Sequence, residues 1–299
     1  MSQTRIDSLQ ENTNLQFNTL SGTNSDTKST VASIAGYISG FLIYLILFIY
    51  GTMVMRGVME EKVSRIAEVI VSSVKPYQLM LGKIFSIGAV GLVQFLIWIA
   101  IVFGLSLMLP FIFPGLAGHA AEIQTAVPNA GAQSAAAIQS AAETPGFIQG
   151  LSEVNFPLII SCFVFYFLGG YLLYSSLFAA VGSAVNEDPQ DAQTLVLPIT
   201  MPIIFSFVIL SKAINDPGSG LAIFGSLFPL TSPIVMMGRV TQGVPDAVPV
   251  WQLLLSMAFL IIGFLATTWL AAKIYRTGIL MYGKKITWKE MWKWALRKS

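Results

Sequence analysis

The sequence predicts an all-α integral membrane protein with about five transmembrane helices. Of its 299 residues, 55% are hydrophobic and 11% are charged, and the mean hydropathy is +0.71. Charged residues make up about a quarter of an ordinary water-soluble domain, so too few are present here to cover a soluble surface. The charges also gather in short stretches between long apolar runs. This arrangement is typical of a chain that crosses a bilayer several times.

Five apolar runs are long enough to be transmembrane helices. An α-helix rises about 1.5 Å per residue, so about 20 residues cross the ~30 Å hydrocarbon core of a bilayer. The expected spans cover residues 31–55, 84–109, 157–181, 192–210 and 250–272. The second and third spans are joined by an Ala-rich connector, residues 111–156, that contains no Lys or Arg.

Two shorter apolar pieces, residues 221–230 and 234–240, precede the last span. Neither is long enough to cross the bilayer, and Pro229 and Pro233 separate them. Backbone at membrane depth needs hydrogen-bond partners from the surrounding protein or from a water-filled cavity. The sequence therefore predicts a re-entrant helical hairpin here.

Residues 57–83 form a densely charged stretch between the first two spans. At 100° per residue, the apolar side chains of Met59 and Val63 share one face, while Glu61, Arg65 and Glu68 lie on the opposite face. Glu61 with Arg65, and Arg65 with Glu68, have the spacing of helical ion pairs. The stretch predicts an amphipathic helix on a membrane surface. Periodicity alone leaves open whether it is a solvated connector or docks a partner.

The chain divides into three regions on composition. Residues 1–30 are polar and rich in Asn, Ser and Thr, and we expect a disordered extracytoplasmic tail there. Residues 31–272 form the transmembrane domain. Residues 273–299 are basic, with three interleaved tryptophans, which favours a cytoplasmic helix lying on anionic membrane lipid.

The distribution of Lys and Arg predicts the orientation. With five spans and an N-terminus outside, thirteen of the 17 basic residues fall on the inner side and four on the outer side. Positive residues in short loops stay in the cytoplasm. We therefore expect a multi-pass protein of the cell inner (plasma) membrane, with the N-terminus out and the C-terminus in.

Several classes of chemistry are excluded. Cys162 and His119 are the single residues of their types, so the chain can form neither an intrachain disulfide nor a Cys- or His-rich metal site. Gly82-Lys83 and Gly283-Lys284 lack the glycine spacing and the following Ser or Thr of a P-loop. We therefore predict no catalytic residues, no bound cofactor or metal, and no enzyme activity of its own. Nucleic-acid binding is equally unsupported.

Four strings resemble the type-2 ABC exporter permeases, in particular their sodium-efflux-like branch. They are MRGVMEEKVSRIAEVIVSSVKPYQLMLGK at 55–83, DPQDAQ at 188–193, FPLTSPIVMMGRV at 228–240 and YRTGILMYGKK at 275–285. The resemblance covers nearly all of the chain from about Val31. It implies that residues 57–75 form a cytoplasmic coupling helix that contacts a separate ABC ATPase subunit. On that basis the candidate coupling residues are Glu60, Glu61, Arg65 and Glu68.

The resemblance also implies a second permease subunit, identical or related, and export driven by ATP hydrolysis in the ATPase. Sodium is the substrate suggested by the branch, and drugs, lipids and peptides remain open. Members of the family usually begin with a first transmembrane helix and a large extracytoplasmic domain, and this sequence matches neither. We therefore expect a shortened homologue or the downstream part of a longer permease.

Two other functions stay open. A non-transporting membrane scaffold, derived from a truncated permease, fits the missing first span but not the intact coupling-helix sequence. A small secondary transporter or channel needs ionisable residues inside the membrane, and the five spans hold none away from their ends.

Overall fold

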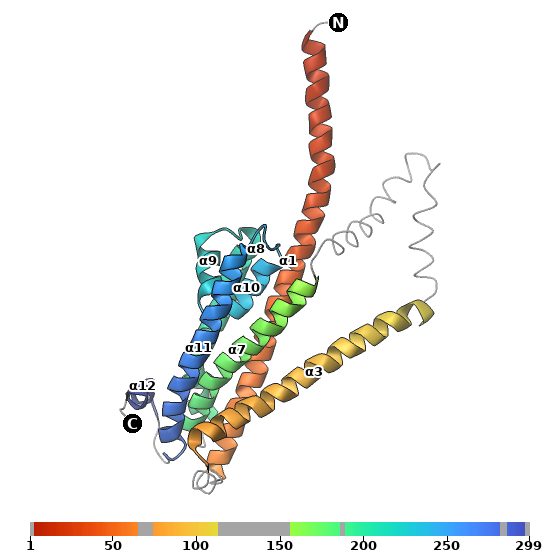
Figure 1. The fold of residues 1–299 in the computed structure, drawn as a ribbon. Helices are drawn as coiled ribbons and strands as arrows, with labels where there is room; N and C mark the ends of the chain where they lie inside the picture. Colours follow the sequence, from red (N-terminus) through yellow and green to blue (C-terminus); the bar gives the residue numbers. More distant parts are fainter. Residues whose placement is uncertain (1–2, 65–73, 113–155, 186–188, 282–285, 297–299) are drawn as a thin grey trace. The chain divides into compact units, whose positions relative to one another are not determined.

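In the computed structural model, residues 3–64, 74–112, 156–185, 189–281 and 286–296 are described. Within them, every regular element is an α-helix (Figure 1). The helices are α1 (Gln3–Val63), α3 (Pro76–Ile112), α7 (Phe156–Ala184), α8 (Pro189–Asn215), α9 (Gly220–Leu227), α10 (Ser232–Val240), α11 (Val250–Gly278) and α12 (Trp288–Leu296). The predicted all-α class is confirmed.

Five of these helices are long and apolar enough to cross a membrane. The candidate spans are Thr30–Val63, Pro76–Ile101, Pro157–Ala184, Ala192–Asn215 and Val250–Gly278. They overlap all five expected spans, so the predicted number is confirmed. Prolines occupy the beginnings of α3 and α8, at Pro76 and Pro189, because the first helical turn does not need the backbone N–H that proline lacks.

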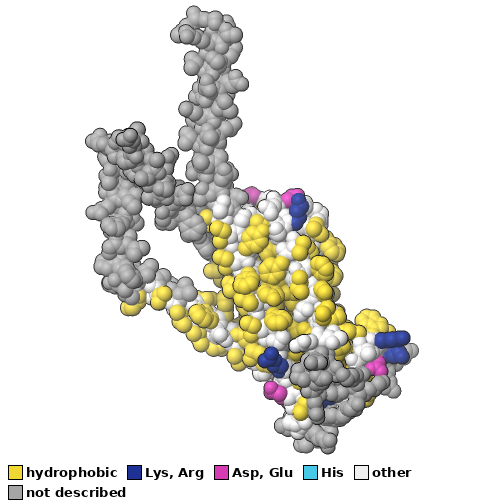
Figure 2. All heavy atoms as spheres, turned by 180° about the vertical axis from the view of Figure 1, so that it is seen from behind, with side chains coloured by type: hydrophobic (Ala, Val, Ile, Leu, Met, Phe, Trp, Pro, Cys, Tyr) yellow, Lys and Arg dark blue, Asp and Glu magenta, His cyan; other side chains and the backbone are white. Residues whose placement is uncertain are grey.

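The chain separates into two units, residues 1–31 with 90–153, and residues 32–89 with 154–299. The first holds the N-terminal part of α1 and the distal part of α3. The second holds the rest of α1, the beginning of α3, the other helices and the site described below. On the face of the second unit seen in Figure 2, hydrophobic side chains cover the middle and charged side chains lie toward the two ends. This is the distribution expected of a surface that meets lipid.

The interior of the second unit is organised around α10. All nine of its residues are buried, and it packs against α7, α8, α9 and α11. Tyr174 of α7 donates a hydrogen bond of 2.6 Å to the carbonyl of Leu230, just before α10. The two short helices predicted before the last span are therefore present. Their re-entrant position in a membrane stays a prediction.

The end of α1 differs from the sequence prediction. The helix starts at Gln3, and the disordered extracytoplasmic tail expected over residues 1–30 stays a prediction. The helix also continues past Met55 to Val63. Residues 57–63 are thus its last two turns rather than the start of a separate helix, because a single glycine does not end a helix supported by packing. Residues 65–73 lie outside the described part.

Helix α12 follows the last span in the basic tail. Met291 and Ala295 are buried, whereas Trp292 and Leu296 are 58% and 66% exposed. The helix packs beside α11, so one face is used within the protein. The exposed apolar residues are consistent with an interfacial position, but contact with lipid stays a prediction.

Candidate functional site

The end of α1 and the beginning of α3 are joined by a partly buried ion pair. The ammonium nitrogen of Lys83 lies 2.6 Å from Oε1 of Glu61, and the two side chains are 15% and 23% exposed. The same ammonium donates a hydrogen bond of 2.6 Å to the carbonyl of Gly57. A side chain at Gly57 would place its Cβ 3.2 Å from the Lys83 nitrogen, so the glycine leaves room for this contact. Lys83 therefore links two positions on the last turns of α1.

A second lysine, Lys62, connects α1 to the end of α7. Its side chain is 1% exposed, and its ammonium donates hydrogen bonds to the carbonyls of Ser183, at 2.7 Å, and Ala184, at 3.5 Å. These are the last residues of α7, whose terminal carbonyls have no partner within the helix. The positive charge also lies at the negative end of the helix dipole. Lys62 thus acts as a C-terminal cap supplied by another helix.

Two glycines allow the helices to approach closely at this end. A Cβ on Gly182 of α7 would lie 2.6 Å from the carbonyl oxygen of Met55 in α1, and one on Gly278 of α11 would lie 2.9 Å from the carbonyl oxygen of Ser183. Both distances are shorter than real Cβ contacts, so the backbones can meet only where a side chain is absent. We call this convergence of α1, α3, α7 and α11, defined by Glu61, Lys62, Lys83, Ser183 and Gly278, the helix junction.

The helix junction contains two buried polar atoms without hydrogen-bond partners among the described residues. They are the second carboxylate oxygen of Glu61 and the hydroxyl oxygen of Tyr275. Buried polar groups in native proteins are nearly always paired. These two atoms are therefore exceptions to the usual pairing.

The structure places only part of the predicted coupling set. Glu60 is exposed, as a partner contact requires, whereas Glu61 turns toward Lys83. Arg65 and Glu68 lie outside the described residues, so their pairing with Glu61 stays a prediction, as does the coupling role of all four. Sequence reasoning missed Lys62 and Lys83 as site residues. The spacing in the sequence could have indicated that Lys62 is buried. Lys62 follows Val54 and Val58 at intervals of four residues, so the three share one helix face, and both valines are fully buried.

At the opposite end of the second unit, a buried arginine holds three segments together. Arg239 of α10 is 1% exposed and donates hydrogen bonds to the Pro217 carbonyl at 3.0 Å, the Ser226 hydroxyl at 2.7 Å and the Gln252 side-chain carbonyl at 2.8 Å. All three partners are uncharged. Burial lowers the pKa of the Arg239 guanidinium, although an arginine in a protein stays protonated. We interpret Arg239 as a structural link.

The described residues contain no group of three or more His, Cys, Asp and Glu that could hold a metal ion. Cys162 is free and buried.

Comparison with known proteins gives the following matches. The family described as ABC-2 family transporter protein matches residues 1–273. The uncharacterized protein YhaP of Bacillus subtilis strain 168 is 31% identical over 264 residues, which cover 87% of this chain and 54% of the relative. The uncharacterized protein MJ1024 of Methanocaldococcus jannaschii is 27% identical over 260 residues, covering 86% and 53%. The chain thus spans about half the length of these relatives. No solved structure matches it significantly.

Proposed function

Because the chain belongs to the ABC-2 family of transporter proteins, we propose that it acts as the permease part of an ABC exporter driven by a separate ATPase subunit. The family and the five apolar helices make it a multi-pass membrane protein and a transporter component. The family match does not by itself establish coupling to an ATPase, pairing with a second permease chain or export of sodium, and these three points are part of the proposal. Pairing and sodium rest on the sequence resemblance alone.

The observation that carries the coupling proposal is the ion pair between Glu61 and Lys83. Most of the segment that resembles a coupling helix, residues 57–75, lies between these two residues in the chain, and their side chains are in contact. A force applied to that segment therefore acts on α1 and α3 together. Lys62 passes the same displacement to α7 through the carbonyl of Ser183, and the close contact at Gly278 extends it to α11.

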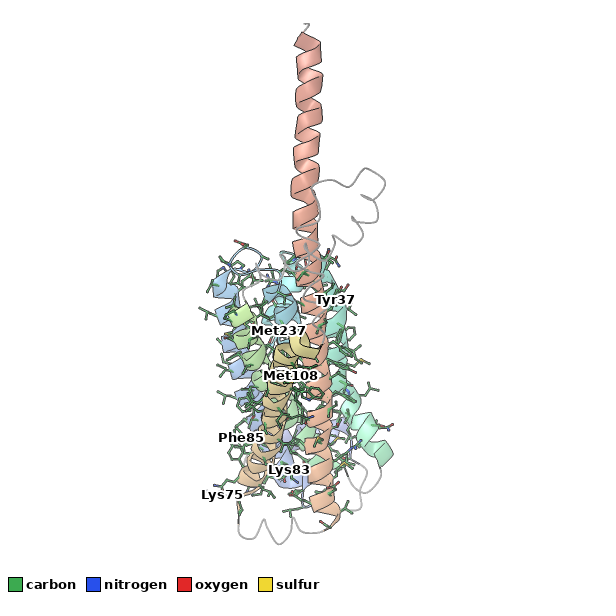
Figure 3. The ribbon with its side chains drawn as sticks, turned by 90° about the vertical axis from the view of Figure 1, so that its right-hand side faces the viewer. Tyr37, Lys75, Lys83, Phe85, Met108 and Met237 are labelled. Carbon is green, nitrogen blue, oxygen red and sulfur yellow. The ribbon has the colours of Figure 1, made fainter. Side chains whose placement is uncertain are left out.

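The ends of the helices differ in the groups they offer to a partner. Figure 3 shows Lys75 and Lys83 at one end of the bundle and Tyr37 toward the other. With the orientation predicted by the basic residues, the end with Lys83 faces the cytoplasm. Glu60 is exposed there, so we propose that it and the residues that follow Ser64 meet the ATPase.

The test is reconstitution with the ABC-type ATPases encoded in the same genome, each expressed in turn with this chain. We expect one of them to copurify and its ATP hydrolysis in proteoliposomes to be stimulated by the chain. Glu60→Lys should weaken both effects, because charge reversal at an interface places like charges together. Asp216→Lys is the matched control, since Asp216 is 53% exposed at the far end of α8.

Two results would contradict the proposal. If Glu60→Lys and Asp216→Lys reduced ATPase copurification and stimulated hydrolysis equally, the ATPase would not bind specifically at the Lys83 end. Stable binding of an ATPase, with neither stimulated hydrolysis nor uptake of radioactive sodium or another substrate into inside-out vesicles, would favour the non-transporting scaffold.

A further inference from the structure

A groove of about 840 Å³ lies between the beginning of α3 and the end of α11. Its floor and walls are largely hydrophobic, and three cationic side chains belong to its lining. The residues that matter for its chemistry are Lys75, Phe85, Leu265, Trp269, Lys273 and Arg276. All lie in the second unit of the chain. In Figure 3, Lys75 and Phe85 lie along the same edge of α3.

Both walls of the groove change from charged to apolar along its length, starting from the same end of the groove. On the α3 wall, Lys75 comes first and the apolar Leu81 and Phe85 follow; on the α11 wall, Phe264 and Leu265 come first and Lys273 and Arg276 come last. Because α3 begins where α11 ends, the cations gather at one end of the groove and the apolar side chains extend from it. Ten to twelve helical residues cover about 15 to 18 Å, which is about the hydrocarbon depth of one leaflet.

The groove is accessible and carries charge of one sign. Trp269 and Leu265 are each 59% exposed and Phe85 is 54% exposed. The Lys273 ammonium stands over the Trp269 ring, 4.0 Å from its centroid, so its position is fixed by a cation–π contact. The described lining contains three cations and no carboxylate. An occupant therefore needs an anionic head beside an apolar body.

We propose that this groove binds one anionic phospholipid, with its phosphate and headgroup at Lys75, Lys273 and Arg276 and an acyl chain against Phe85 and Leu265. An anionic lipid satisfies both the charge and the length of the groove. A zwitterionic lipid supplies no net negative charge to three cations, and a second copy of this chain would have to present a carboxylate inside an apolar surface. The proposal does not depend on which substrate the protein transports.

The test uses tryptophan quenching by brominated lipid in vesicles of fixed composition. The chain has six tryptophans, so one variant keeps only Trp269 and a matched control keeps only Trp251, which is 61% exposed at the other end of α11. Two vesicle preparations contain phosphatidylglycerol and phosphatidylcholine in the same ratio. In one the phosphatidylglycerol is brominated, and in the other the phosphatidylcholine is brominated. Each nearby cation adds about fivefold to anionic-lipid binding. We expect quenching of Trp269 to favour phosphatidylglycerol at least fivefold and that of Trp251 to show no preference.

A charge variant separates a defined site from general surface attraction. Lys75→Gln with Lys273→Gln and Arg276→Gln should abolish the preference at Trp269, while Lys289→Gln with Lys293→Gln, on α12, should leave it. Native mass spectrometry of the unmodified full-length chain should likewise retain phosphatidylglycerol over phosphatidylcholine. Equal quenching by both lipids, equal loss in the two charge variants, or no quenching of Trp269 by either lipid would overturn the proposal; the last result would mean that protein covers the groove.

Discussion

The ammonium of Lys83 lies 2.6 Å from the carboxylate of Glu61, and this contact connects α1 and α3 on either side of residues 64–75, which belong to the segment that resembles a coupling helix. Because both side chains are mostly buried, they should depend on each other energetically. We predict a coupling energy of about 0.5 to 3 kcal/mol in a double-mutant cycle of Glu61→Gln and Lys83→Met. Thermal or chemical unfolding in detergent micelles measures it.

The chain contains a matched surface pair for comparison. Lys212 and Asp216 lie 3.6 Å apart, and both side chains are 53% exposed. A solvated pair of this kind contributes about 0.2 to 1 kcal/mol at most. A coupling energy between Glu61 and Lys83 no larger than that of the control pair would show that the junction is not held by charge.

The closeness of α1 and α7 gives a second prediction. Gly182→Ala places a Cβ 2.6 Å from the Met55 carbonyl oxygen, which is backbone and cannot rotate away, so the helices must move apart. Overpacking of this kind costs about 1 to 3 kcal/mol. We expect a lower midpoint of thermal unfolding for Gly182→Ala in detergent.

The control is Gly82→Ala in α3, where an added Cβ meets nothing within 4 Å. Alanine is a better helix former than glycine by about 1 kcal/mol, so this variant should be unchanged or slightly stabilised. If both variants unfold at the wild-type midpoint, α1 and α7 do not pack as described.

A third prediction concerns the guanidinium of Arg239, which reaches three segments at once. Lysine keeps the charge but not the planar fork of donors. Arg239→Lys should therefore leave buried acceptors such as Ser226 and Gln252 unpaired, at a cost of about 1 to 3 kcal/mol. Arg56→Lys, at an exposed position on α1, is the control and should not change the unfolding midpoint. A wild-type midpoint for Arg239→Lys would show that charge alone is enough.

The sequence predicted the spans better than it predicted the polar contacts. Length and hydropathy locate a transmembrane helix, and all five were found. Helix ends depend on packing, so the extension of α1 to Val63 was not visible in the apolar pattern. Lys62 and Arg239 were counted only as charges of the inner and outer sides, yet both are 1% exposed. Their partners are backbone carbonyls and neutral side chains distant in the sequence, which no local pattern identifies.

The orientation of the chain gives the last prediction, and it determines which end of the bundle an ATPase can reach. Ser64 is exposed after α1, and Asp216 is exposed after α8, so Ser64→Cys and Asp216→Cys report on opposite ends. Native Cys162 is 2% exposed and should contribute little labelling. Since basic residues stay inside, a membrane-impermeant thiol reagent added to intact cells should modify Asp216→Cys and leave Ser64→Cys unmodified until the membrane is permeabilised. The reverse pattern would place the Lys83 end outside, where no ATPase could act on it.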